Sequence, residues 1–275
     1  MTGARRYLLS SLAIALSLIV FVVPFAFILL TAVKDQRQAS LLDFSWPHHF
    51  QLVQNFIDVV RARDYMVIIA FINSTVLTVC SVTIMVVLAA MVAFVLQRRV
   101  TRFTGLINFL VLSGLIIPPA VVPTIWVLQK LGIFQTMIGL IFVEVAFGLS
   151  FCVLLFRAFI ATIPRELDEA AIIDGAGPLR LFFRVVLPLL RSVVVTVVVV
   201  QSVTVFNDFT NPLYFLPGDD APTVQLTLFN FQTQYNTQYN LLFADILLIT
   251  IPPLIMFIFF NRKIVSGLTA GAVKG

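Results

Sequence analysis

The chain has 275 residues, of which 60% are hydrophobic and 11% are charged, and its mean hydropathy is +1.04. Soluble domains carry about 25% charged residues, so this chain lacks the charge to cover a water-facing surface, and a membrane protein is predicted. The net charge of +5 does not indicate nucleic-acid binding, because the basic residues cluster at the ends of apolar runs, as topology signals do.

Six apolar runs predict six transmembrane helices, and the fold class is therefore all-α and polytopic. The first run lies between Arg6 and Lys34. It far exceeds the roughly 7–15 apolar residues of a cleaved signal peptide, so we expect a retained helix. The other runs cover residues 65–97, 103–129, 131–156, a stretch that begins after 191 and continues past 208, and about 241–261.

The distribution of Lys and Arg predicts the orientation. With the N-terminus inside, the inner segments hold 13 of the 18 basic residues and the outer segments hold 5. Cytoplasmic loops carry an excess of Lys and Arg, so both termini are expected in the cytoplasm. The largest inner loop is then 157–191, between the fourth and fifth spans.

Prolines interrupt several of these runs, at Pro24, at Pro118, Pro119 and Pro123, and at Pro252 and Pro253. Proline removes a backbone hydrogen bond and bends a helix. Lipid tolerates this where neighbouring helices or water satisfy the freed carbonyls. Two interpretations are open at this point: simple helix-packing geometry, or kinks that open a cavity or act as hinges.

The inner loop carries ordered helix signals. Pro164 suits the first turn of a helix, and the acidic residues that follow are favoured there by the helix dipole. Gly175 is a plausible left-handed cap, Pro178 can open a second short helix over 179–186, and Pro188 should stop it. We expect two short helices joined at a glycine turn across the inner face of the membrane, with small residues that let another protein approach closely.

The same stretch resembles a known family. The pattern E-A-A-x3-G-x9-I-x-L-P is typical of inner-membrane permease subunits of binding-protein-dependent ABC importers. The chain matches it with Glu169, Ala170, Ala171, Gly175, Leu187 and Pro188, and has Val185 in place of the isoleucine. The segments "LGIFQT" (131–136), "NDFTNPL" (207–213) and "GLTAGAVKG" (267–275) resemble the smaller permease of maltose-type carbohydrate importers.

This resemblance implies a set of partners. The chain would be one permease domain, 1–275, in a prokaryotic cytoplasmic membrane, paired with a second permease subunit as a heterodimer. A cytoplasmic ATPase dimer would carry ATP-Mg and dock on the loop 157–191, and an extracytoplasmic binding protein would deliver a sugar. The implied docking residues are Glu169, Ala170, Ala171, Asp174, Gly175, Leu187 and Pro188. The tail, 262–275, would also reach the ATPases, with Thr269 and Lys274 as candidate contacts.

The sequence contains no sign of catalysis by this chain. No Gly-Lys dipeptide occurs, so the phosphate-binding loop G-x4-G-K-[S/T] is absent and the chain is not expected to be an enzyme or to bind a cofactor. His48 and His49 are the only histidines, and they have no metal-ligand spacing.

Several polar residues in or near the spans are candidates for the substrate path. They are Glu144, Asn207, Asp208, Asn211 and Asp245. Amides and carboxylates can hydrogen-bond sugar hydroxyls, but packing between spans and contact with the binding protein explain these residues equally well. A carboxylate at mid-span costs roughly 2.5–3.5 kcal/mol, so Glu144 should face protein or water.

Two rival functions remain to be tested. An intramembrane serine protease needs a histidine base within the membrane, and the spans have none. An ion-coupled secondary transporter could use Glu144, Asp208 and Asp245 as titrating groups. It would not need a docking loop, which favours the importer. The particular sugar cannot be inferred.

Overall fold

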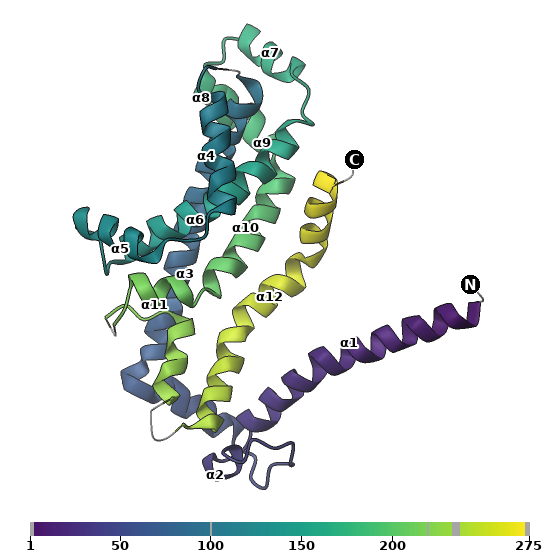
Figure 1. Ribbon diagram of the computed structural model, residues 1–275, viewed down its shortest axis with the longest axis vertical. Helices are drawn as coiled ribbons and strands as arrows, with labels where there is room; N and C mark the ends of the chain where they lie inside the picture. The colour runs from purple at the N-terminus through teal and green to yellow at the C-terminus, as the bar shows by residue number, and fades with distance from the viewer. Residues whose placement is uncertain (1–2, 100, 219, 233–236, 273–275) are drawn as a thin grey trace. The chain divides into compact units, whose positions relative to one another are not determined.

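The computed structural model describes residues 3–99, 101–218, 220–232 and 237–272, with the backbone alone for 3–9 and 261–272. Over these residues the chain is helical and connected by loops, apart from one bridge between Gln232 and Thr237 (Figure 1). It divides into two units, Met1–Phe71 with Val224–Ile251, and Ile72–Thr223 with Pro252–Gly275.

The first unit is built around the end of the first apolar run. It contains α1 (Gly3–Ala32), α2 (Gln36–Ala39), the start of α3 (Leu52–Arg98), the 3-10 helix η2 (Val224–Phe231) and the start of α12 (Tyr239–Ala272). Its small apolar core consists of Ala32, Val59, Val67, Phe231, Leu242 and Ala244. The Phe27 and Phe243 rings meet edge to face with their centroids 5.6 Å apart, which joins α1 to α12.

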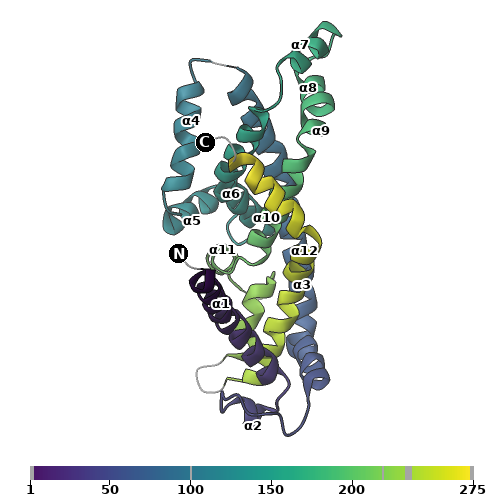
Figure 2. The same ribbon diagram turned by 90° about the vertical axis from the view of Figure 1, so that its right-hand side faces the viewer.

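The second unit packs around α6 (Met137–Ile160). Alongside the remainder of α3 it holds α4 (Thr104–Ile116), α5 (Val121–Lys130), α10 (Arg191–Phe206) and α11 (Thr210–Phe215). The helix α6 contacts α4, α10 and α11, and these helices are labelled in Figures 1 and 2. A Cβ on Gly148 would strike the Met85 sulfur of α3, so the glycine permits the close approach of these two helices.

Among the described residues, four helical segments are long and apolar enough to cross a membrane: Ser10–Ala32 in α1, Leu52–Arg98, Met137–Ile160, and Tyr239–Phe260 in α12. A fifth candidate is the bent pair Pro178–Leu189 and Arg191–Phe206, whose halves meet at 78°. These segments correspond to the predicted runs one, two, four, six and five. The membrane fold is confirmed at this level, and the count of six and the side on which each terminus lies stay predictions.

The third predicted run is not one helix. It divides into α4 and α5, with Ile117–Ala120 between them. The 13 residues of α4 span about 20 Å, which is short of the hydrocarbon thickness. Ile117 is extended (φ −77°, ψ 122°), as the residue before a proline tends to be, and Pro118 and Pro119 have no N–H to continue the helix.

Prolines therefore act differently along the chain. The break at Pro118–Pro119 borders a pocket of about 470 Å³, which agrees with the interpretation that this kink opens a cavity. In contrast, Pro24 lies inside α1, and Pro252 and Pro253 lie inside α12, without ending either helix.

Candidate functional site

The predicted helix–glycine–helix element is present in the second unit. The helix α7 (Glu166–Ile173) ends in a left-handed glycine, Gly175, with φ +78°. The Ala176 N–H donates to Ala171 O (2.9 Å) and the Gly175 N–H to Ile172 O (3.0 Å). These two bonds form a Schellman motif, which satisfies the last carbonyls of the helix.

The second half of the element is longer than predicted. It runs through α8 (Pro178–Leu181), a π-helical turn η1 (Phe182–Val186) and α9 (Leu187–Leu189). Pro188 was expected to stop it, but the chain turns two residues later, at Leu190, where ψ is 4°. A π-turn directly precedes Pro188, where the missing N–H prevents regular α-helical bonding. Leu181, Phe182 and Val186 are buried, and Leu179 and Phe183 are exposed.

A buried ion pair holds α7 to the end of α3. Arg98 Nε lies 2.7 Å from Asp168 Oδ2, and the two side chains are 9% and 12% exposed. Arg98 Nη2 also donates to Ile163 O at 2.9 Å, and the Phe94 ring of α3 lies 5.8 Å from that of Phe182. From the sequence, Arg98 was expected to act only as a topology signal. The pair leaves no local signal, because its members are far apart in the chain.

The implied docking residues lie together on this anchored element. Glu169, Ala170, Asp174, Gly175 and Pro188 are exposed, and Ala171 and Leu187 are half-buried. Ile173 is 85% exposed and Leu179 is 64% exposed. An exposed apolar surface beside acidic residues, on an element that is itself well ordered, is suited to docking another protein.

Three of the five path candidates meet between α6 and the start of α11. The Asn211 side-chain Nδ2 donates to Glu144 Oε1 (3.2 Å), and the Asn211 backbone N–H donates to Asp208 Oδ1 (3.3 Å). Asp208 Oδ1 also accepts from the Thr210 N–H (2.8 Å). Asn211 therefore forms hydrogen bonds with both carboxyl groups. Glu144 is 5% exposed, as expected for a mid-span carboxyl group held by protein contacts.

The remaining candidates lie elsewhere. Asn207 is exposed at the end of α10. Asp245 belongs to the first unit, where it is fully buried and accepts a hydrogen bond from Thr227 Oγ1 at 2.8 Å. Thr269 lies in the last turns of α12, where only the backbone is described, and Lys274 lies outside the described residues.

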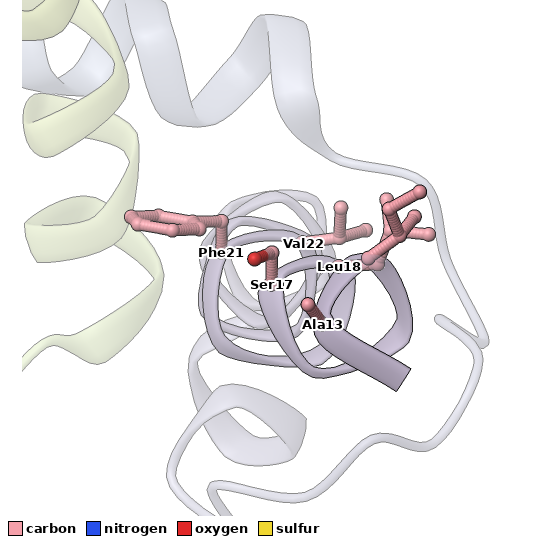
Figure 3. Close-up of a pocket in the computed structure, with 6 residues that line it drawn as sticks. Ala13, Ser17, Leu18, Phe21 and Val22 are labelled. Carbon is pink, nitrogen blue, oxygen red and sulfur yellow. The ribbon is translucent and has the colours of Figure 1, made fainter. Parts of the chain in front are cut away.

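The helix α1 presents an apolar surface over its membrane-spanning length, except for its last turn, where Thr31 and Ala32 are buried. No residue of its most apolar window is buried within the chain. Figure 3 shows a shallow groove on this helix, where Ala13 and Ser17 lie between Phe21 on one side and Leu18 and Val22 on the other. Small residues spaced by four allow another helix to approach closely in a membrane.

Apolar helices of spanning length, a broken third segment and an anchored helix–glycine–helix element define an α-helical membrane protein.

The comparison with known families agrees and is more specific. Residues 85–269 match the family described as the binding-protein-dependent transport system inner membrane component. The chain belongs to this family, and it is therefore an inner-membrane transport subunit.

Two relatives illustrate the similarity. The probable starch degradation products transport system permease protein AmyC of Thermoanaerobacterium thermosulfurigenes is 32% identical over 272 residues, covering 98% of this chain and 97% of that protein. The melibiose/raffinose/stachyose import permease protein MelC of Bacillus subtilis (strain 168) is 32% identical over 209 residues, covering 75% and 76%.

Among solved structures, the chain is similar to one from a bacterial ABC transporter involved in the import of the acidic polysaccharide alginate. The TM-score is 0.81 at 16% identity, with 95% of this chain and 98% of that chain covered. At this identity the likeness shows the fold. None of these comparisons supports the ion-coupled alternative.

Proposed function

We propose that this chain is one of two permease subunits of an ATP-driven sugar importer, and that partner ATPases drive it through the helix–glycine–helix element. The observation that carries the proposal is this element itself: Gly175 caps α7, Asp168 anchors it to α3, and its outer surface is exposed. The chain would hold no ATP. ATP-Mg would bind to the ATPase dimer, and the element 157–191 would receive its motion.

The contacts of the element suggest how the motion is passed on. A displacement of α7 acts on α3 through the Arg98–Asp168 pair. It also acts on α10 through η1 and α9, which lead into that helix through the turn at Leu190. The first path ends in α3, which is long enough to cross the membrane, and the second ends in α10, which is half of the bent fifth candidate span, so movement of the docking surface can rearrange the membrane segments.

The substrate path is proposed to run past the break in the third segment. The pocket there is lined by Ile117–Ala120 and by Ala146 and Phe147 of α6, close along the helix to Glu144. Irregular backbone at membrane depth is tolerated where it lines a water-filled cavity. The Glu144–Asn211–Asp208 cluster offers carboxylate and amide groups that can pair with sugar hydroxyls, and Asn207 and Asp245 are the weaker candidates.

Six spans with both termini in the cytoplasm complete the proposal, and the distribution of Lys and Arg supports that orientation. The second permease subunit would cover part of α1, whose apolar surface lacks cover from this chain. The tail 262–275, with Thr269 and Lys274, would reach the ATPases. A sugar-binding protein would dock on the outer face, as the name of the family indicates.

Reconstitution tests this function directly. Proteoliposomes with both permease subunits, the ATPases and the binding protein should take up a labelled sugar only with ATP inside. The sugars that AmyC and MelC are named for, starch fragments and melibiose, raffinose or stachyose, form the first panel. Uptake without any ATPase, driven by a proton or sodium gradient, would overturn the proposal.

A further inference from the structure

Residues 33–51, which connect α1 to α3, satisfy the polar groups of Lys34, Asp43 and Gln38 internally. Lys34 is fully buried, and its Nζ donates to the Asp43 backbone oxygen and to Asp43 Oδ1, both at 2.8 Å. The hydrogen bonds from Lys34 and Ser45 lower the pKa of Asp43 to about 2. A lysine directly after a membrane helix usually extends to water. Here its charge is neutralised inside the loop.

Two amides complete this network. Gln38 Nε2 donates to Trp46 O (2.8 Å), and Gln38 Oε1 accepts from the His48 N–H (3.0 Å). Asn55 Nδ2 donates to Ala32 O (2.8 Å) and Lys34 O (2.9 Å). The loop is thereby fixed both within itself and to the end of α1.

The same loop directs its large apolar side chains outward. Trp46 is 76% exposed and Phe50 is 71% exposed, and Leu41, Leu42 and Phe44 are exposed as well. A loop that faces water would have the opposite arrangement, with the lysine outside and the tryptophan inside.

The helix that follows the loop has the same character. The helix α3 is interrupted at Ala62–Tyr65, where three successive residues have positive φ, so residues 52–61 form a separate helix before the span. Its inner face carries Asn55 and Val59, which are buried. Its other side forms a shallow groove of about 460 Å³ lined by Val53, Phe56, Ile57, Val60, Arg61 and Tyr65.

We propose that the 33–51 loop and the helix 52–61 form a phospholipid-binding surface at the membrane–water interface. The surface directly continues α1, whose last turns expose Phe25 and Leu29. Exposed Trp and Phe at the end of a span are typical of this interface. The groove has the composition that a phospholipid needs: an apolar floor for an acyl chain, and Arg61 at its edge for the phosphate.

Charge supports the lipid as the occupant. Arg61 is exposed and forms no ion pair or hydrogen bond with any residue that the structure describes. Arg37, which is exposed in α2, lies outside the groove and is therefore a matched control. The inference requires only that α1 spans the membrane. It holds whichever sugar is carried, and its failure leaves the transport proposal intact.

Tryptophan fluorescence tests the position of the loop. The chain has two tryptophans, so Trp126→Phe leaves Trp46 alone and Trp46→Phe serves as the control. In vesicles of phosphatidylcholine and phosphatidylglycerol, we expect Trp46 emission to be quenched more by lipids brominated near the top of the acyl chain than by lipids brominated near its end, and weakly by aqueous iodide. Strong iodide quenching without bromine quenching would overturn the proposal, and so would protection from iodide that appears only on adding the binding protein.

Native mass spectrometry of the full chain tests the groove. Arg61→Gln should retain phosphatidylglycerol about fivefold less well than the unmodified chain, since one basic group near anionic lipid is worth about that factor. Arg37→Gln should retain it normally, and inorganic phosphate should not displace it. Equal retention by the two variants would contradict the assignment of Arg61.

Discussion

The helix–glycine–helix element and the loop 33–51 both lie outside the long apolar helices, and they use their polar residues in opposite ways. In the structure this element covers 161–190, between α6 and α10, within the predicted loop 157–191. In 161–190, the acidic residues Glu169 and Asp174 are exposed, and a single buried pair, Arg98 with Asp168, holds α7 to α3. In 33–51, Lys34 and Gln38 are buried in an internal network, and Trp46 is exposed. The first surface is polar and apolar together and suits a protein partner. The second exposes large apolar side chains such as Trp46 beside Arg37 and the two histidines, and we propose that it binds lipid.

The difference teaches that exposure has to be judged with the surroundings of the chain. Ile173 and Trp46 are among the most exposed apolar side chains outside the spans, at 85% and 76%. Large exposed apolar patches usually mark an interaction site. Acidic neighbours distinguish the docking element, and adjacency to the end of α1 distinguishes the loop.

The largest effect on this comparison is expected from Asp168→Ala. It leaves Arg98 buried without its carboxylate, which costs about 3–5 kcal/mol when a buried pair is broken. We expect faster tryptic cleavage at Arg165 and Arg180 and loss of ATP-driven uptake. The control is Glu166→Ala on the exposed side of the same helix, which should behave normally. The exchange R98D/D168R should restore part of the uptake, and equal behaviour of the two single variants would remove the anchoring role.

The next effect is expected at the glycine turn. Gly175 and Gly177 both have open space at the Cβ position, but only Gly175 has a positive φ. Gly175→Ala should strain the turn by about 1–2 kcal/mol, which corresponds to roughly 5–30-fold weaker ATPase binding if the turn must keep its shape on docking. Gly177→Ala should bind normally in the same pull-down. A large effect at Gly177 and none at Gly175 would show that space, not backbone conformation, matters there.

A smaller effect is expected in the 33–51 loop from Asn55→Leu. The change leaves the Ala32 and Lys34 carbonyls without their donor, which costs about 1–3 kcal/mol in a buried site. Thermal unfolding in detergent should begin at a lower temperature, and protease should cut the loop faster. Gln54→Leu, on the exposed neighbour, is the control. Both variants should bind the ATPases normally. Weakened ATPase binding by Asn55→Leu would show that the 33–51 loop and the helix–glycine–helix element do not act independently.

The smallest effect concerns pH. Since the folded-state pKa of Asp43 is about 2 and lies below its ordinary value of 3.8, its stabilising contribution is present above about pH 4 and is lost as the pH falls through 2. Trp46 emission in the Trp126→Phe chain should report loosening of the loop in this window. Asp43→Asn should lack that transition. A transition of equal size at the same pH in Asp43→Asn would assign it to another group.

The first half of the helix–glycine–helix element could be predicted because its signals are local. The acidic first turn and Gly175 specify a capped helix within a dozen residues, and the observed turn agrees, although Pro164 lies just before the helix rather than in its first turn. The second half was not predicted as well, because it continues past Pro188. The proline pair Pro118–Pro119 was also visible in the sequence, but the sequence did not show that it divides the third run into two helices. Similar prolines in α12 leave the helix unbroken, so neighbouring contacts decide whether a proline kinks or divides a helix.

The sequence alone determined that the chain resides in a membrane, because composition and apolar run lengths leave no other solvent for its surface. It also determined the shape of the docking turn, because caps and left-handed glycines act over a few residues. Only the tertiary structure decided which charges are buried, joining Arg98 to Asp168, Lys34 to Asp43 and Glu144 to Asn211. A buried polar group is stable only beside its partner, and when that partner lies on another segment, packing rather than sequence spacing brings the two together.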